Sequence, residues 1–99
     1  MTTCFVTRPN GPLGTERKAQ FPDATDMVRP GNINAWDNED VVKAVKATGK
    51  KQLIMDGVVT EVCVACPALS ASEEGCDVFG VTDASGTFNE MTRQSAWDR

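Results

Sequence analysis

The sequence contains no histidine and no tyrosine among its 99 residues. The absence of histidine excludes Ser-His-Asp and Cys-His catalytic schemes, and it excludes metal sites that depend on imidazole ligands. Any proton transfer must therefore use a carboxylate, lysine, cysteine or water. No apolar run approaches the roughly 20 residues that span a membrane, and no charged and then apolar leader opens the chain. We therefore expect a cytoplasmic protein.

Basic residues are also few. Ten Lys and Arg stand against 14 Asp and Glu, which gives a formal charge of −4. Nucleic-acid binding needs a basic face, so the charge argues against such a partner. Hydrophobic residues make up 40% and charged residues 24%, as expected for one globular domain. Nothing marks the four cysteines as a secreted disulfide framework, so we expect reduced thiols.

The first half of the chain is expected to contain short elements. The pattern predicts short strands at residues 1–7 and 27–29, with one helical turn between them at 16–20. Apolar residues at i, i+3, i+4 and i+7 then predict a helix. It should begin at Asp37 or Asn38, run to about Thr48 and end at Gly49.

The second half continues the alternation of strand and helix. A mostly apolar strand is expected at 51–59, buried on both faces, followed by a helix that Thr60 caps and Gly75 ends. Another strand is expected at 76–82, and the T-x-x-E pattern of Thr87 and Glu90 predicts the start of a last helix. This order predicts an α/β fold with a parallel, doubly wound sheet, whose chemistry lies beyond the carboxyl ends of the strands.

Cys63 is the leading candidate nucleophile. It follows the strand at 51–59 and falls in the first turn of the next helix, where free N–H groups and the helix dipole favour a thiolate. The same N–H groups can stabilise an oxyanion. The alternative is a small buried apolar cysteine. Because Cys66 completes a C-x-x-C pattern, a dithiol redox centre is a further alternative, whereas a zinc site would lack two suitably spaced ligands.

Other polar residues are weaker candidates. Arg29 ends a short strand and can place a cation near a thiolate or a substrate carboxylate; the alternative is an ordinary surface arginine. Asn34 and Trp36 lie in an amide-rich loop that either lines a pocket or interface, or is simply a capped loop around a packed tryptophan. Asp83 is expected to brace a loop rather than to take part in catalysis.

Long motifs in the chain resemble one family. They are PNGPL at 9–13, KAQFPD at 18–23, RPGNINAWDNEDVVKAVKATGKKQLIMDGVVTEVCVACPALSASEEG, and DVFGVTDASGTFNEMTRQSAWDR. Together they resemble the isochorismatase-like cysteine hydrolases of the YcaC type over nearly the whole chain. The resemblance implies a three-layer, Rossmann-type α/β fold, a small-molecule substrate, no metal or cofactor, and a homo-oligomer that is octameric in YcaC-like members. Related families cleave amide C–N bonds or a vinyl ether.

The resemblance also implies roles for individual residues. Cys63 corresponds to the nucleophile of the family, and Arg29 to the basic residue of its catalytic set. A non-proline cis peptide is expected at about Val59–Thr60, and oxyanion donors are expected near Thr60 and Cys63. The implied function is hydrolysis of an amide-type C–N bond in a small molecule.

Family members are about twice as long as this chain. The strand that carries their catalytic Asp has no counterpart here, so we expect residues 1–99 to be a single partial domain without the opening strand and the C-terminal part. Several positions are smaller or more polar than in the resembling proteins, and we expect them to weaken the core: Asp56, Cys66, Ser72, Cys76 and Gly80. The alternative function is therefore an inactive fragment that acts only in oligomer packing.

Overall fold

The computed structural model describes residues 2–5, 15–29 and 31–99. They fall into two compact units, within residues 1–48 and 49–99, and each is described by itself. Both units combine helices with parallel strands, so the fold is α/β as predicted. None of the helices in the described ranges has the length and apolar character that a bilayer crossing requires.

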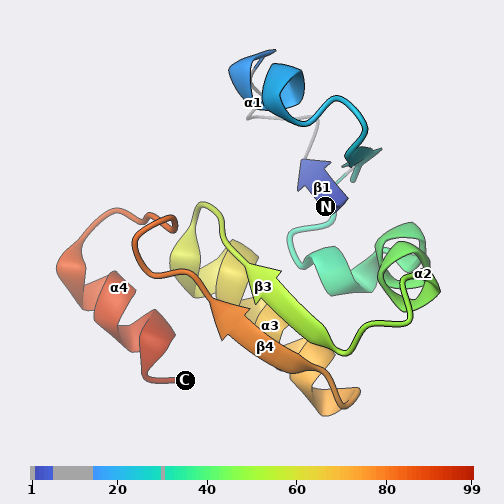
Figure 1. Ribbon diagram of the computed structural model, residues 1–99. Helices are drawn as coiled ribbons and strands as arrows, with labels where there is room; N and C mark the ends of the chain where they lie inside the picture. Colours follow the sequence, from blue (N-terminus) through green and yellow to red (C-terminus); the bar gives the residue numbers. More distant parts are fainter. Residues whose placement is uncertain (1, 6–14, 30) are drawn as a thin grey trace. The chain divides into compact units, whose positions relative to one another are not determined.

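The first unit contains a two-stranded parallel sheet and two α-helices (Figure 1). Strand β1, Thr2–Phe5, pairs with β2, Thr25–Val28. Helix α1, Thr15–Gln20, joins them in sequence, and α2, Glu39–Ala47, follows. Parallel strands need a crossover connection, which explains why the chain passes through α1 before β2.

Helix α2 begins and ends where the sequence predicts. The side chain of Asn38 accepts hydrogen bonds from the amides of Asp40 and Val41, so Asn38 is the N-terminal cap. After the helix, Gly49 adopts a φ of +69°, a left-handed conformation that costs glycine little. Val41 is the buried residue of the helix.

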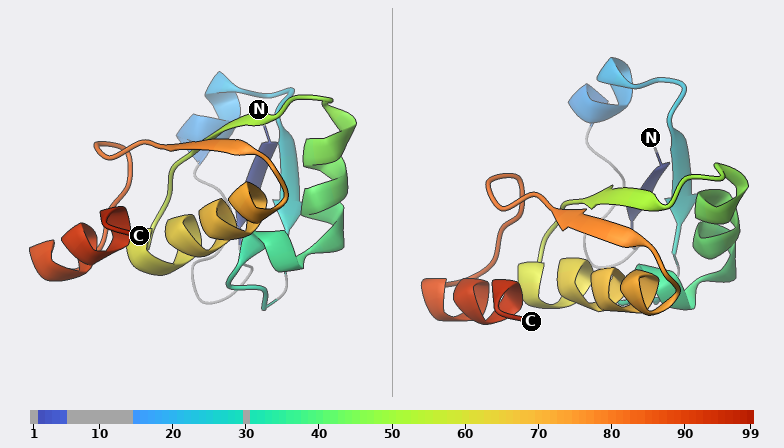
Figure 2. Two further views of the ribbon diagram at one scale, coloured as in Figure 1. Left: turned by 90° about the horizontal axis from the view of Figure 1, so that it is seen from below. Right: turned by 60° about the horizontal axis from the view of Figure 1, so that its bottom comes forward.

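The second unit repeats the strand–helix–strand pattern. Strand β3, Gln52–Met55, leads to a π-helical turn, Thr60–Val64, and on into α3, Ala65–Glu73. Strand β4, Asp77–Gly80, pairs in parallel with β3, and α4, Glu90–Trp97, is the last helix of the described chain. Helix α3 lies along one face of the strand pair in the views of Figures 1 and 2.

The strand predicted at 51–59 is shorter than expected, and it is not buried on both faces. Exposure alternates along β3, with Leu53 half-buried and Ile54 79% exposed. The register partner of Ile54 in β4 is Phe79, which is 55% exposed. Because α3 packs against the opposite face, burial is one-sided. Asp56 follows β3 and is exposed, so its carboxylate is not buried in a core as the sequence had suggested.

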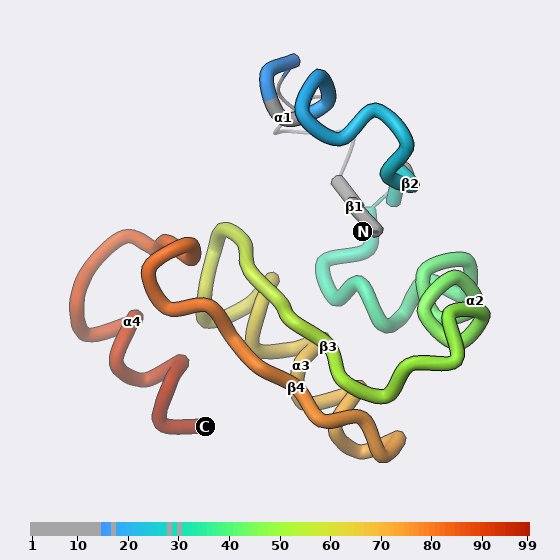
Figure 3. The backbone as a smooth tube through the Cα atoms, viewed as in Figure 1, coloured from blue at the N-terminus to red at the C-terminus, as the bar shows by residue number. Residues whose placement is uncertain are grey.

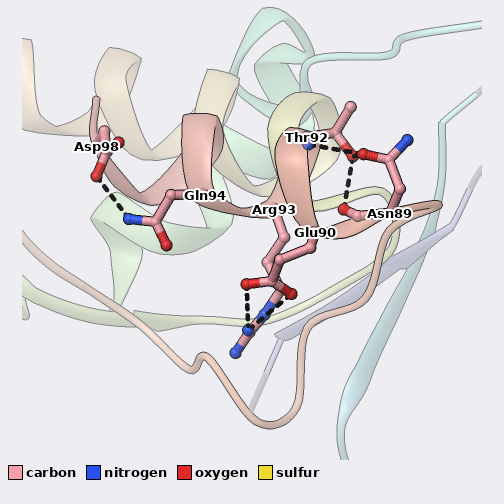
Figure 4. A network of polar contacts seen from close by, with 6 residues as sticks. All are labelled: Asn89, Glu90, Thr92, Arg93, Gln94 and Asp98. Atoms are coloured by element: carbon pink, nitrogen blue, oxygen red, sulfur yellow. Dashed lines mark hydrogen bonds and ion pairs between the residues drawn. The ribbon is translucent and has the colours of Figure 1, made fainter.

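The cap predicted for the last helix is also wrong. The side chain of Asn89 accepts a hydrogen bond from the amide of Thr92 at 2.9 Å, which makes Asn89 the N-terminal cap of α4 (Figure 4). Thr87 lies two residues before this cap and cannot form a capping box with Glu90. The Thr87 hydroxyl instead donates to the carboxylate of Glu61.

Gly80 allows α4 to approach β4 closely. A Cβ atom at Gly80 would lie 2.5 Å from Cζ3 of Trp97, so the indole occupies the space that a side chain would take. Gly80 was expected to weaken the core because it has no side chain, but the indole of Trp97 occupies the space at that position. Ser72, also expected to weaken the core, is exposed.

We predict that Gly80→Ala destabilises the protein. The added methyl group overlaps the indole of Trp97, and such overpacking costs about 1–3 kcal/mol. Urea unfolding followed by circular dichroism should show a lower midpoint. Gly86→Ala is a matched control, because a Cβ there would lie 3.7 Å from Cγ2 of Val58, an ordinary contact. A Gly80→Ala midpoint at or above that of the parent would contradict the prediction.

Candidate active site

Cys63 lies in the π-helical turn that follows β3. Its thiol is free and half-buried. The turn is wound more widely than an α-helix, since the amide of Ala65 donates to the carbonyl of Thr60, five residues earlier. Pro67 has no N–H and cannot donate to the carbonyl of Cys63. The proline therefore interrupts the α-helical ladder at the residue that carries the thiol.

The segments that follow β3 and β4 run side by side toward this turn (Figure 3). Their contact is a parallel bridge between Val58 and Gly86. The peptide bond between Val58 and Val59 is cis. We expected a cis bond at about Val59–Thr60, and the observed bond lies one residue earlier, because the motif gives the neighbourhood of the bond and not its position.

Gly86 binds the segment that precedes Cys63 through both its amide and its carbonyl. Its amide donates to the carbonyl of Gly57 at 3.1 Å. Its carbonyl accepts two hydrogen bonds from Thr60, one from the amide and one from the hydroxyl, each at 3.0 Å. Thr60 is 1% exposed and its side chain makes no cap hydrogen bond, so the prediction that it caps the helix is wrong. The hydroxyl instead fastens the turn to the segment after β4.

The two amides expected to hold an oxyanion already have acceptors within the chain. Thr60 donates to the carbonyl of Gly86, and the amide of Cys63 donates to the carbonyl of Val59 at 2.8 Å. Either amide would have to share or leave its acceptor to stabilise an oxyanion. Their role in the site stays a prediction.

Glu61 lies in the same turn as Cys63 and makes two contacts that were not predicted from the sequence. Its Oε2 accepts a hydrogen bond of 2.5 Å from the hydroxyl of Thr87, and its carbonyl accepts one of 3.1 Å from Nη2 of Arg99. Thr87 was expected to act only as a local cap, and no partner was predicted for Glu61. They are 26 residues apart, and no periodicity or motif connects them, so no sequence signal could have paired them.

Arg29 lies in the first unit and is 7% exposed, so the alternative of an ordinary surface arginine is wrong. Its Nη1 donates to the carbonyls of Asn32 at 2.7 Å and Ile33 at 3.3 Å. These bonds fix the start of the loop that leads to α2. Cys63 belongs to the second unit, and the predicted partnership of Arg29 with its thiol stays a prediction.

Asn34 and Trp36 form the capped loop that was one of the two interpretations. Oδ1 of Asn34 accepts from the amide of Trp36 at 3.0 Å and caps a short 3₁₀ turn, Ala35–Asp37. Trp36 is half-buried. A role in lining a substrate pocket stays a prediction for both residues. Asp83 is exposed in the turn at residues 82–84.

The remaining described cysteines, Cys66 and Cys76, are free and half-buried. Cys4 lies among the residues whose side chains are not described. In the part of the chain that the structure describes, no three Cys, Asp or Glu side chains gather as a metal site would require. A groove between α3, β4 and α4 has Thr60 and Trp97 among its lining residues, but Cys63 does not line it.

We predict that Arg29→Met destabilises the protein. The substitution removes a charged donor from the carbonyls of Asn32 and Ile33 in a buried setting, at a cost of about 1–3 kcal/mol. Urea unfolding should show this loss. Arg93→Met is the matched control, since Arg93 makes an exposed ion pair with Glu90 that contributes little. Equal midpoints for the two variants would show that the carbonyl contacts of Arg29 add nothing.

The isochorismatase domain pattern matches residues 7–99 of the chain. The chain is 79% identical over its whole length to "Probable hydrolase YcaC" of Escherichia coli (strain K12), of which it covers 48%. It is also 32% identical over 80 residues, 81% of the chain and 40% of the relative, to "Nicotinamidase 3" of Arabidopsis thaliana. The chain therefore spans about half the length of the first of these relatives, and less of the second.

Two solved structures are similar at high identity. The YcaC gene product of Escherichia coli, described as an octameric hydrolase of unknown specificity, gives a TM-score of 0.91 at 80% identity over 99% of this chain and 48% of that one. YcaC from Pseudomonas aeruginosa, solved with hexane-2,5-diol and covalent acrylamide, gives 0.91 at 70% identity over 98% and 48%. The fold described for this chain is thus similar to that of the matched part of both proteins.

Proposed function

Because the chain belongs to the isochorismatase family, we propose that it forms the cysteine-bearing part of a hydrolase in which Cys63 is the nucleophile. The position of Cys63 carries the proposal. It lies in the turn that follows a parallel strand, at the carboxyl edge where α/β sheets bind their ligands. Its thiol is free, and the residue is not fully buried.

The relatives support both the nucleophile and the bond it attacks. The Pseudomonas aeruginosa relative carries covalent acrylamide, an electrophile to which thiolates add readily. The Arabidopsis thaliana relative is a nicotinamidase, and nicotinamide is a small aromatic amide. Together they favour a small molecule with an amide-type C–N bond as the substrate class.

In the proposed reaction the Cys63 thiolate attacks the amide carbon. A C–S bond forms, and the carbonyl electron pair moves to oxygen. Collapse of this adduct breaks the C–N bond, and the nitrogen leaves with a proton. Water then adds to the thioester, releasing a carboxylic acid and returning the thiol. Since the chain has no histidine, its own residues can move these protons only through a carboxylate, lysine, cysteine or water.

Other residues take proposed roles around this step. Arg29 supplies positive charge to the thiolate or to the substrate, and the segment of Val59 and Thr60 lies where the oxyanion forms. Asn34 and Trp36 are proposed to line the substrate pocket. The catalytic Asp expected from the family resemblance has no counterpart in residues 1–99. The reaction as proposed uses no metal or organic cofactor.

The proposed assembly is a homo-oligomer in the cytoplasm. Its support is the Escherichia coli relative, which is described as octameric. The two rival functions, oligomer packing without catalysis and a Cys63–Cys66 dithiol, are separated from hydrolysis by the two experiments below.

We predict that Cys63 is the thiol that reacts fastest with acrylamide near neutral pH. The protein should be treated with less than one equivalent of acrylamide and mapped by peptide mass spectrometry. Cys66 and Cys76 should label more slowly, because neither lies in the turn after a strand. Faster labelling of Cys4, Cys66 or Cys76 would refute the nucleophile assignment. Formation of a Cys63–Cys66 disulfide under mild oxidation would favour the dithiol function.

We predict that hydrolysis of small amides depends on Cys63. Ammonia release from a panel that includes nicotinamide and aliphatic amides should fall roughly a thousandfold or more in Cys63→Ser, because the covalent step is lost. Cys66→Ser removes a neighbouring thiol of the same chemistry and should keep the parent rate. Turnover that survives in Cys63→Ser, or that is lost equally in both variants, would contradict the proposed mechanism.

A further inference from the structure

We propose that Glu61 and Thr87 form a positioning pair that orients the Cys63 thiol. The inference rests on the proposed role of Cys63 as nucleophile and adds two residues to it. Glu61 and Cys63 belong to the same five-residue turn, Thr60–Val64. A contact that fixes Glu61 therefore also restrains the backbone that carries the thiol two residues later.

The bond between Glu61 and Thr87 is well suited to this task. The Thr87 hydroxyl donates to Oε2 of Glu61 at 2.5 Å, and both side chains are half-buried. Hydrogen bonds to a carboxylate are shorter and roughly twice as strong as those between neutral groups. Without the hydroxyl, the Glu61 carboxylate would turn toward water, and the turn would lose its side-chain anchor.

The pair complements a backbone anchor at the adjacent position. The carbonyl of Gly86 accepts two hydrogen bonds from Thr60, and the hydroxyl of Thr87 donates one to Glu61. Two adjacent residues, 86 and 87, therefore contact the adjacent residues 60 and 61. The contact through Gly86 fixes where the turn begins. The contact through Thr87 lies one residue further on and fixes how the turn is rotated about its axis.

Thr87 lies beside the first turn of α4. Its hydroxyl oxygen lies 3.4 Å from that of Thr92. Thr92 is bound to the capping residue Asn89 through its amide at 2.9 Å and through its hydroxyl at 3.0 Å, as Figure 4 shows. The donor that Glu61 receives therefore lies next to the capped first turn of a helix.

The turn needs such an anchor because its own ladder is incomplete. The winding is of the π type, and Pro67 supplies no amide to the carbonyl of Cys63. Backbone hydrogen bonds consequently constrain Cys63 less than they constrain a residue inside an α-helix. Two side-chain contacts to Glu61, from Thr87 and from Arg99, restore the constraint from outside the helix.

The test measures acrylamide addition at each thiol separately. In this reaction the Cys63 sulfur bonds to the terminal alkene carbon, and the displaced electron pair takes a proton from water at the adjacent carbon. Thr87→Val removes the hydroxyl and keeps the shape of the side chain. We expect it to slow addition at Cys63 about tenfold, as misorientation of a nucleophile does. Addition at Cys66 and Cys76 should be unchanged, and Thr87→Ser should restore the parent rate.

Three further measurements make the result decisive. Thr48→Val removes a hydroxyl that bonds within the first unit, to the carbonyl of Val45, and should leave the Cys63 rate unchanged. Glu61→Ala removes the acceptor and should reproduce the selective loss, which keeps the test valid if Thr87→Val fails to fold. The double variant should be no slower than either single one, because the two changes remove the same bond.

The outcomes separate the pair from the proposed function. An unchanged or faster Cys63 rate in Thr87→Val overturns the pair, as does an equal loss at all three thiols, which would indicate loosening of the whole unit. A lower urea midpoint without a selective rate change also overturns it. If Cys63 is not the fastest thiol in the parent protein, the nucleophile assignment fails, whereas the ratio between the Thr87 variants still decides the positioning pair.

Discussion

The backbone of Gly86 is the constraint on which the geometry around Cys63 depends. Its amide and its carbonyl face the same segment, so one residue binds Gly57 before the cis bond and Thr60 after it. A segment held at both ends has few conformations left, and the turn that carries the thiol starts from a defined point. Thr60 completes this arrangement as a buried residue whose amide and hydroxyl share one acceptor.

The strand register brings Gly86 to this place. Met55 and Gly80 are partners at the ends of β3 and β4, and the amide of Val81 extends the ladder by donating to the carbonyl of Met55 at 2.9 Å. Both strands therefore release the chain at the same edge, and the two following segments emerge as neighbours. Parallel pairing requires this edge to be shared, which is why α/β folds place their chemistry there. The function proposed for Cys63 uses that property of the sheet.

Local rules predicted the elements better than they predicted the contacts between them. The periodicity of the first half placed α2, and Asn38 and Gly49 mark its ends because an amide-oxygen cap and a left-handed glycine are decided by adjacent residues. The strand at 51–59 was overestimated because an apolar run records hydrophobicity and not how many faces are covered. Ile54 of β3 and its register partner in β4, Phe79, are both exposed.

The candidate site divides in the same way. Cys63 could be singled out because its position after a strand is visible in one stretch of sequence. Thr60 was wrongly predicted as a cap, because a threonine before a helix is usually one. Its hydroxyl instead donates to the carbonyl of Gly86, 26 residues away. The Glu61–Thr87 bond depends on the register of β3 and β4, and no pattern within either segment carries that information.

The close approach of Trp97 to Gly80 has a spectroscopic consequence. The chain contains two tryptophans and no tyrosine, so its near-ultraviolet emission comes from indole alone. Trp36 belongs to the first unit and Trp97 to the second, and both are half-buried. Replacing either with phenylalanine would leave one fluorophore per molecule, and with it a separate optical report on each unit. The emission of Trp97 would then follow the docking of α4 onto β4, next to the turn that carries Cys63.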